Sequence, residues 1–150
     1  MRIYMAYKYK SVPNKEQLIN DLNDLSDQFS GLGHAAFILG RDIQDWSSTT
    51  PLWKTIPQIV INLFKSHLVF VYIQHDGETV GLPIELTLAK LLNKNIVIAV
   101  KKEYENDKHI KWANTLITFN DLAELKAKIK ETFSGSEPFV QASKTDLINN

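Results

Sequence analysis

The sequence predicts an α/β protein, a flavodoxin- or Rossmann-like three-layer sandwich with a parallel sheet of about five strands. Short apolar runs alternate along the chain with longer segments of helical periodicity, as in parallel sheets covered on both faces. With 150 residues, the chain is long enough for one domain with a sizeable core. It contains no internal repeat and no linker that would divide it.

The expected strands are apolar runs of five or six residues, at 2–7, 35–39, 68–73, 96–100 and 115–119. The first helix is expected from Pro13-Asn14 to a stop at Gly31 and Gly33. The loop 40–50 then leads past Pro51 into a second helix, whose start Pro57 is expected to delay because proline suits a first turn.

The third helix is expected over about 83–92, and the last follows a cap at Asn120 and reaches Phe133. Between strands four and five, residues 101–114 are expected to form a polar loop. We assign residues 1–133 to the domain and 134–150 to a polar tail, either an arm or a disordered end.

The composition excludes several function classes. Seventeen basic and 17 acidic residues give a net charge of zero, which argues against binding a nucleic-acid polymer. The absence of cysteine excludes disulfides, zinc–thiolate sites and cysteine nucleophiles. No apolar run approaches the roughly 18 residues of a membrane span, and the N-terminus leads directly into a strand, so a cytoplasmic protein is expected.

The histidines at 34, 67, 75 and 109 lack the spacing of metal ligands, and surface or loop roles are expected for them. We expect neither a metal nor a cofactor. The glycines of Gly31-Leu-Gly33 end a helix, whereas a dinucleotide fingerprint opens one. The chain also lacks a phosphate-loop signature and a nucleophile elbow.

Residues 75–89 look most like a site, because a buried strand there runs through a glycine-containing loop into a helix. Pro83 suits the first helical position, which would put Glu85 in the first turn, near the positive end of the helix dipole, where its carboxylate would stay ionised. The alternative is a carboxylate that only stabilises the helix. In a flavodoxin-like order the ligand crevice lies between strands one and three, with residues 4–10 and 76–81 as its walls.

The chain resembles the nucleoside 2-deoxyribosyltransferase family and its nucleotide N-glycosidase relatives over about residues 1–130. The matching residues are Arg2-Ile-Tyr4-Met-Ala6, Val80-Gly81-Leu-Pro-Ile-Glu85-Leu-Thr-Leu-Ala89 and the apolar run 95–100. The resemblance implies that Glu85 is the nucleophile that attacks the anomeric carbon of a nucleoside and that Tyr4 orients it. The glycosyl-enzyme would be resolved by a second base or by water.

The resemblance and the crevice together give a set of candidate substrate-binding residues: Ala6, Tyr7, Lys8, Asp42, Trp46, Gln58, Asp76, Thr79, Gly81 and Asn114. Asp42, Asp45 or Asp76 would protonate the departing base, or each is a solvated loop acid. Trp46 and Trp112 would stack on a base or pack as a lid. Asn114 is the nearest match to a family residue that completes the site of a neighbouring subunit, so the resemblance implies a homo-oligomer.

Departures from the family pattern bear on the substrate. Thr79 stands where transferases often carry an aspartate and nucleotide hydrolases a hydroxyl residue near the 5′-phosphate, which favours a phosphorylated ligand. Lys8 and Lys10 would add positive charge there, or are ordinary solvated lysines. Gln58 replaces the family's substrate-binding aspartate, and bulky residues from Tyr7 to Lys10 replace its glycine-rich loop.

The leading hypothesis is therefore an enzyme of N-glycosidic bonds that acts on small nucleosides or nucleoside 5′-monophosphates through Glu85. One alternative is a nucleotide-binding or sensing module that has lost turnover. Another is a TIR-like domain that cleaves NAD, because such domains share the strand–loop–helix glutamate.

Overall fold

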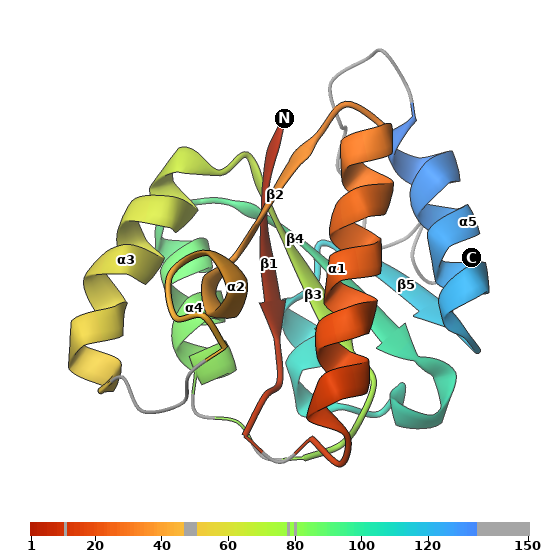
Figure 1. Ribbon diagram of the computed structural model, residues 1–150, viewed down its shortest axis with the longest axis horizontal. Helices are drawn as coiled ribbons and strands as arrows, with labels where there is room; N and C mark the ends of the chain where they lie inside the picture. Colours follow the sequence, from red (N-terminus) through yellow and green to blue (C-terminus); the bar gives the residue numbers. More distant parts are fainter. Residues whose placement is uncertain (11, 47–50, 78, 80, 135–150) are drawn as a thin grey trace.

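The computed structural model describes residues 1–10, 12–46, 51–77, 79 and 81–134, and it contains one five-stranded parallel sheet. The strand order is β2-β1-β3-β4-β5, so β1 separates the sheet's two winding directions. This is the predicted flavodoxin-like three-layer arrangement (Figure 1). Of the predicted tail, residues 135–150 lie outside the described residues.

The strands are β1 (Arg2–Tyr7), β2 (Ala35–Ile38), β3 (Leu68–Ile73), β4 (Asn95–Lys101) and β5 (Thr115–Phe119). The α-helices are α1 (Lys15–Gly31), α2 (Leu39–Asp42), α3 (Leu52–Lys65), α4 (Gly81–Leu91) and α5 (Leu122–Phe133). Two short 3-10 helices, η1 (Lys102–Tyr104) and η2 (Lys108–Trp112), occupy the predicted loop between β4 and β5.

The core lies on both faces of the sheet. Alternate strand residues such as Met5 and Phe70 pack with α1 and α5, while Tyr4, Val69 and Val71 pack with α3 and α4. All six residues of β3 are buried, which explains its uninterrupted apolar sequence.

Several element boundaries differ from the sequence prediction. Helix α2 takes in Leu39, predicted as the end of a strand, and residues 40–42, predicted as loop. Asp121 rather than Asn120 caps α5, its side chain accepting from Glu124 N. Helix α3 begins at Leu52 and includes Pro57 beyond its first turn. Pro57 is tolerated because it is exposed, so the helical carbonyl it leaves without a donor can meet water.

The strand order puts the carboxyl ends of β1 and β3 side by side, at the point where the winding reverses. Ligands of such sheets bind in the crevice outside these ends. Among the described residues, no helix has both the length and the apolar character needed to span a bilayer.

Candidate active site

Glu85 and Tyr4 meet between α4 and the middle of β1. The Tyr4 hydroxyl donates a hydrogen bond of 2.5 Å to Glu85 Oε2, and both side chains are buried. Tyr4 also packs against Phe37 of β2, with 5.4 Å between the ring centroids. The carboxylate is therefore anchored to a rigid central strand rather than to a loop.

The environment of Glu85 differs from the expected one. Helix α4 begins at Gly81, two residues before the predicted start, so Glu85 lies in the second turn and is not next to the free N–H groups. Burial raises the pKa of Glu85 to about 8, against the lowering effect of the hydrogen bond from Tyr4. The predicted first-turn position is thus wrong, and burial opposes the ionisation that this position was expected to favour.

Tyr7 ends β1 beside this pair, and its hydroxyl accepts a hydrogen bond of 3.0 Å from Gly40 N. Burial raises the pKa of Tyr7, and the charge of Glu85 contributes to the shift. Trp46 packs on Tyr7 with 6.2 Å between ring centroids. A Cβ atom at Gly40 would lie 2.4 Å from the Tyr7 hydroxyl and 2.7 Å from the Trp46 ring, so only glycine fits there.

A pocket of about 420 Å³ opens at the carboxyl end of the sheet. Lys8 lines it from the segment after β1, and Asp76, Gly77 and Thr79 line it from the loop after β3. Residues of the segment 103–109, after β4, form the remaining wall. Of the predicted crevice walls, residues 4–10 contribute Lys8 and residues 76–81 contribute Asp76, Gly77 and Thr79, and the segment 103–109 is an additional wall. Tyr4 and Glu85 are not among the residues that line this pocket.

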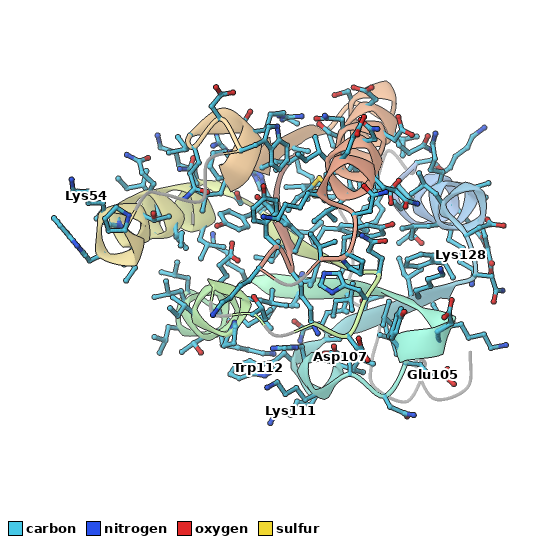
Figure 2. All side chains as sticks on the ribbon, turned by 60° about the horizontal axis from the view of Figure 1, so that its bottom comes forward. Lys54, Glu105, Asp107, Lys111, Trp112 and Lys128 are labelled. Atoms are coloured by element: carbon cyan, nitrogen blue, oxygen red, sulfur yellow. The ribbon has the colours of Figure 1, made fainter. Side chains whose placement is uncertain are left out.

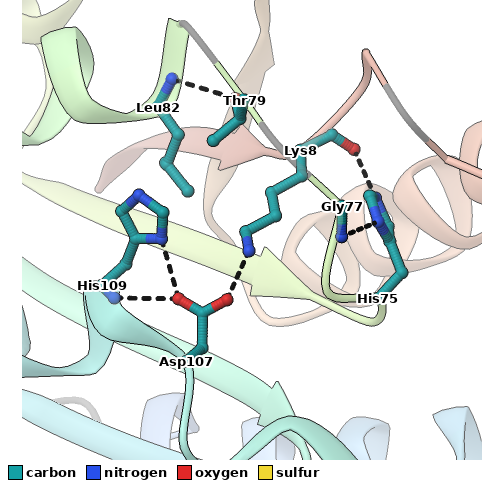
Figure 3. A network of polar contacts seen from close by, with 7 residues as sticks. All are labelled: Lys8, His75, Gly77, Thr79, Leu82, Asp107 and His109. Atoms are coloured by element: carbon teal, nitrogen blue, oxygen red, sulfur yellow. Dashed lines mark hydrogen bonds and ion pairs between the residues drawn. The ribbon is translucent and has the colours of Figure 1, made fainter.

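Lys8 is neither solvated nor free for a ligand. Its side chain is 4% exposed, and its ammonium is paired with Asp107 Oδ2. The other oxygen of Asp107 accepts from the backbone N–H of His109 at 2.8 Å and from its Nδ1 at 2.7 Å (Figure 3). Burial alone would raise the pKa of Asp107, but these hydrogen bonds lower it, so the carboxylate stays ionised.

Thr79, Asp76 and Gly81 lie around the start of α4, as the sequence predicts. Thr79 lines the pocket, and its hydroxyl accepts from Leu82 N at 3.4 Å, in the first turn of α4. Asp76 is exposed and lines the same pocket. A Cβ atom at Gly81 would lie 3.9 Å from Glu85 Oε1, so Gly81 borders the carboxylate.

Two other candidates, Ala6 and Asp42, have structural partners, and a third, Asp45, faces solvent. Ala6 is buried in β1 and pairs with Val71. The Asp42 carboxylate accepts from Ile38 N at 2.9 Å and pairs with Arg41, which fixes the turn after β2. Asp45 is exposed and has a positive φ of 49°.

Gln58 and Asn114 lie elsewhere. Gln58 is half-buried in the middle of α3, where its backbone carbonyl accepts a hydrogen bond from the side chain of Asn62. Asn114 lies at the amino ends of β4 and β5, whereas the pocket lies at the carboxyl ends of the strands. Its side chain accepts a hydrogen bond from Ile96 N at 2.8 Å. Trp112, at the end of η2, packs against the core on the α3–α4 side (Figure 2).

Sequence reasoning missed Asp107 and His109, and it expected surface or loop roles for the histidines. His75 and His109 are in loop segments but are 5% and 3% exposed. His75 uses both ring nitrogens, on the Lys8 carbonyl and on Gly77 N. His109 uses only Nδ1, and its Nε2 is buried with no partner among the residues that the structure describes. The Asp-x-His spacing of 107–109 is the one sequence signal for this contact.

The sequence matches no family model and no curated protein. Solved structures do match. The chain has the fold of a CMP N-glycosidase and of a 2-deoxyribosyltransferase. The CMP N-glycosidase BcmB of Clostridium botulinum aligns with a TM-score of 0.66 at 15% identity, over 87% of this chain and 98% of that one.

The 2-deoxyribosyltransferase of Bacillus psychrosaccharolyticus aligns with a TM-score of 0.59 at 18% identity, over 84% of this chain and 90% of the other. The protein BlsM aligns with a TM-score of 0.68 at 19% identity, over 99% and 94%. The resemblance found in the sequence is therefore confirmed for the fold. Identities this low do not transfer an activity.

Proposed function

We propose that this protein cleaves or exchanges the N-glycosidic bond of nucleosides or nucleoside 5′-monophosphates, with Glu85 as the nucleophile. The observation that carries the proposal is the buried Glu85 carboxyl group, which the Tyr4 hydroxyl holds against β1, the strand at which the winding of the sheet reverses. The fold shared with a CMP N-glycosidase and a 2-deoxyribosyltransferase supports the same reaction class.

In the first step, a Glu85 oxygen forms a bond to C1′ while the bond from C1′ to the base nitrogen breaks. The base leaves with the bonding pair and takes up a proton, for which Asp76 at the pocket wall is a candidate donor. Water or a second base then attacks C1′ and releases Glu85. Two displacements retain the configuration at C1′.

This mechanism requires ionised Glu85, although burial raises its pKa to about 8. Tyr4 assists by donating a hydrogen bond to the charged form. A buried carboxylate has lost most of its hydration, which strengthens it as a nucleophile once the proton is gone. The predicted roles of Thr79 and Asp76 in substrate binding are supported by their positions in the pocket wall.

The second candidate function is a nucleotide-binding module without turnover. The raised pKa of Glu85 favours it, and so does the packing of Trp46 on Tyr7 where the family has a glycine-rich loop. Such a module would bind nucleotides without cleaving them.

Incubation with nucleosides, their 5′-monophosphates and NAD, followed by chromatography of the free base, tests the proposal. Wild type should release base, and Glu85→Gln should not. Mass spectrometry of rapidly acid-quenched protein should show one added glycosyl group on wild type only. Binding without release would favour the module, and release from NAD alone the TIR-like activity. A second base in the reaction distinguishes transfer from hydrolysis.

We also propose that the protein forms a homo-oligomer, as the resemblance implies. Helix α3 supports this with apolar side chains that face solvent: Trp53 and Phe64 are each 70% exposed, and Leu91 of the neighbouring α4 is 76% exposed. Positions 53, 60 and 64 share one helix face. Exposed apolar patches of this kind mark interaction surfaces. A cytoplasmic location stays a prediction of the sequence.

A further inference from the structure

His109 is the one buried histidine of the described chain whose imidazole keeps a nitrogen without a partner. Its side chain is 4% exposed, and Nε2 makes no hydrogen bond with any described residue. A buried polar atom without a partner costs about 1–3 kcal/mol, so most are satisfied by protein, water or a ligand. His75, which is also buried, has both ring nitrogens hydrogen-bonded.

The protonation of His109 follows from its neighbours. Hydrogen bonds from Lys8 and His109 keep Asp107 ionised, so Nδ1 must carry the proton that it donates to Oδ1. Burial lowers the pKa of His109, which makes the imidazole neutral at neutral pH. Nε2 therefore presents a lone pair and acts as a hydrogen-bond acceptor.

The charges around the pocket bear on what it accepts. The ammonium of Lys8 is already neutralised by Asp107, and Asp76 and Glu103 add negative charge to the wall. Lys108 is the remaining basic side chain among the lining residues. This balance disfavours an anion at the His109 end of the pocket.

We propose that His109 Nε2 is a substrate-recognition atom that accepts a hydrogen bond from an uncharged N–H or O–H group of the ligand, held in place by the Lys8–Asp107 ion pair. The inference rests on the proposed function for the identity of the ligand, a nucleoside or nucleotide. Two parts of such a ligand carry this chemistry: a sugar hydroxyl and an amino group of the base.

The position of Nε2 adds one requirement. Figure 3 shows the imidazole between Asp107 and the start of α4, with Nε2 directed away from Asp107 toward Leu82 and Thr79. The atom is covered by the protein, so a donor reaches it only if the neighbouring wall shifts. Leu82, which is fully buried, should therefore change its environment when a ligand binds.

Binding is measured by calorimetry in the Glu85→Gln background, where turnover does not interfere. The probes are pairs that differ in one donor: cytidine and uridine, adenosine and inosine, and each ribonucleoside with its 2′-deoxy form. His109→Ala should bind the donor-bearing member of one pair about three- to tenfold more weakly, the worth of one neutral hydrogen bond. The other member should bind unchanged. His67→Ala is the control, because His67 is exposed and precedes the amino end of β3, whereas the pocket lies at the carboxyl ends of the strands.

The pair that responds tells which part of the ligand His109 contacts. Equal losses within every pair, or no binding of any probe, would overturn the inference. So would a loss confined to the preference for 5′-monophosphates, since His109 would then serve a phosphate.

Nitrogen NMR of wild type needs no variant. The free protein should show an unprotonated Nε2 and a protonated Nδ1, and ligand should shift the Nε2 signal and the Leu82 methyl signals. An Nε2 signal that ligand leaves unchanged would mean that a buried water satisfies this atom, contrary to the proposal. Donor-specific binding without base release would contradict the enzymatic proposal alone.

Discussion

The Tyr4 hydroxyl and Glu85 Oε2 lie 2.5 Å apart, and this contact joins the middle of β1 to the second turn of α4. The two residues are 81 positions apart in the sequence, so the contact depends on β1 lying next to β3, the strand that leads into α4. Burial raises the pKa of the proposed nucleophile and the hydrogen bond from Tyr4 lowers it, so both decide the pH at which Glu85 can react.

The first prediction concerns the pH dependence of catalysis. Because Glu85 must be ionised to attack and its pKa is about 8, kcat/KM should rise with pH and level off above about 8. Tyr4→Phe should move the inflection to higher pH, since the hydrogen bond from Tyr4 lowers this pKa. Tyr72→Phe is the control, because Tyr72 packs in the core on the opposite face of the sheet from Tyr4. An inflection unmoved by Tyr4→Phe would contradict the coupling.

The second prediction concerns stability. The folded protein holds the Glu85 proton more tightly than the unfolded chain does, so wild type loses stability as pH rises from about 4.5 to about 8. Glu85→Gln lacks this titration. Its stability relative to wild type should increase over that window by at most about 1.4 kcal/mol per pH unit, measured by urea unfolding.

Glu124→Gln is a control of opposite sign. The backbone hydrogen bond from Asn120 and the contact with Lys128 lower the pKa of Glu124, so its contribution is present above the unfolded pKa and lost as pH falls. This variant should lose stability relative to wild type as pH rises through the acidic range. The same trend for both variants would contradict the assigned environments.

The sequence predicted the fold because its signals are local and repeated. The apolar run 68–73 reads as a strand without reference to any other residue, and it forms β3. The position of Glu85 next to β1 followed from element order. Its protonation did not, because burial and the true start of α4 depend on the packing of the whole chain.

The 103–109 wall of the pocket could not be predicted either. Lys8 and Asp107 are 99 residues apart and meet only in the folded chain. Each is an ordinary polar residue in a polar segment, where a solvated side chain is the usual outcome. The His109 contact is local to Asp107, but its burial is a property of the fold.

The third prediction tests the ion pair of Lys8 and Asp107, whose side chains are 4% and 5% exposed. Lys8→Met should destabilise the protein by about 3–5 kcal/mol, because it leaves a buried carboxylate without its cation. The double variant Lys8→Met/Asp107→Leu should recover only part of this loss, because it also removes the two hydrogen bonds that Asp107 accepts from His109. Lys101→Met removes an exposed pair with Glu103 and should cost less than about 1 kcal/mol. Equal effects of the two lysine substitutions in urea unfolding would contradict the burial argument.

The fourth prediction concerns Gly40. An added Cβ atom would overlap the Tyr7 hydroxyl and the Trp46 ring, so Gly40→Ala should destabilise the protein by about 1–3 kcal/mol and alter the tryptophan fluorescence. Gly31→Ala is the matched control, since no heavy atom lies within 4 Å of a Cβ atom there. The midpoint of thermal unfolding, measured for both variants and wild type, should fall for Gly40→Ala and not for Gly31→Ala. A stable Gly40→Ala with unchanged fluorescence would mean that Trp46 does not pack on Tyr7 in solution.

The fifth prediction tests the exposed face of α3. If Phe64 is buried against a second copy of the chain, Phe64→Glu should convert the oligomer into monomers, because a carboxylate cannot be buried there without a partner. Sedimentation velocity measures the change, and far-UV circular dichroism should show that the fold is kept. Lys130→Glu replaces an exposed residue of α5 and should leave the assembly unchanged. A wild-type protein that sediments as a monomer, or an oligomer that survives Phe64→Glu, would exclude this face as the interface.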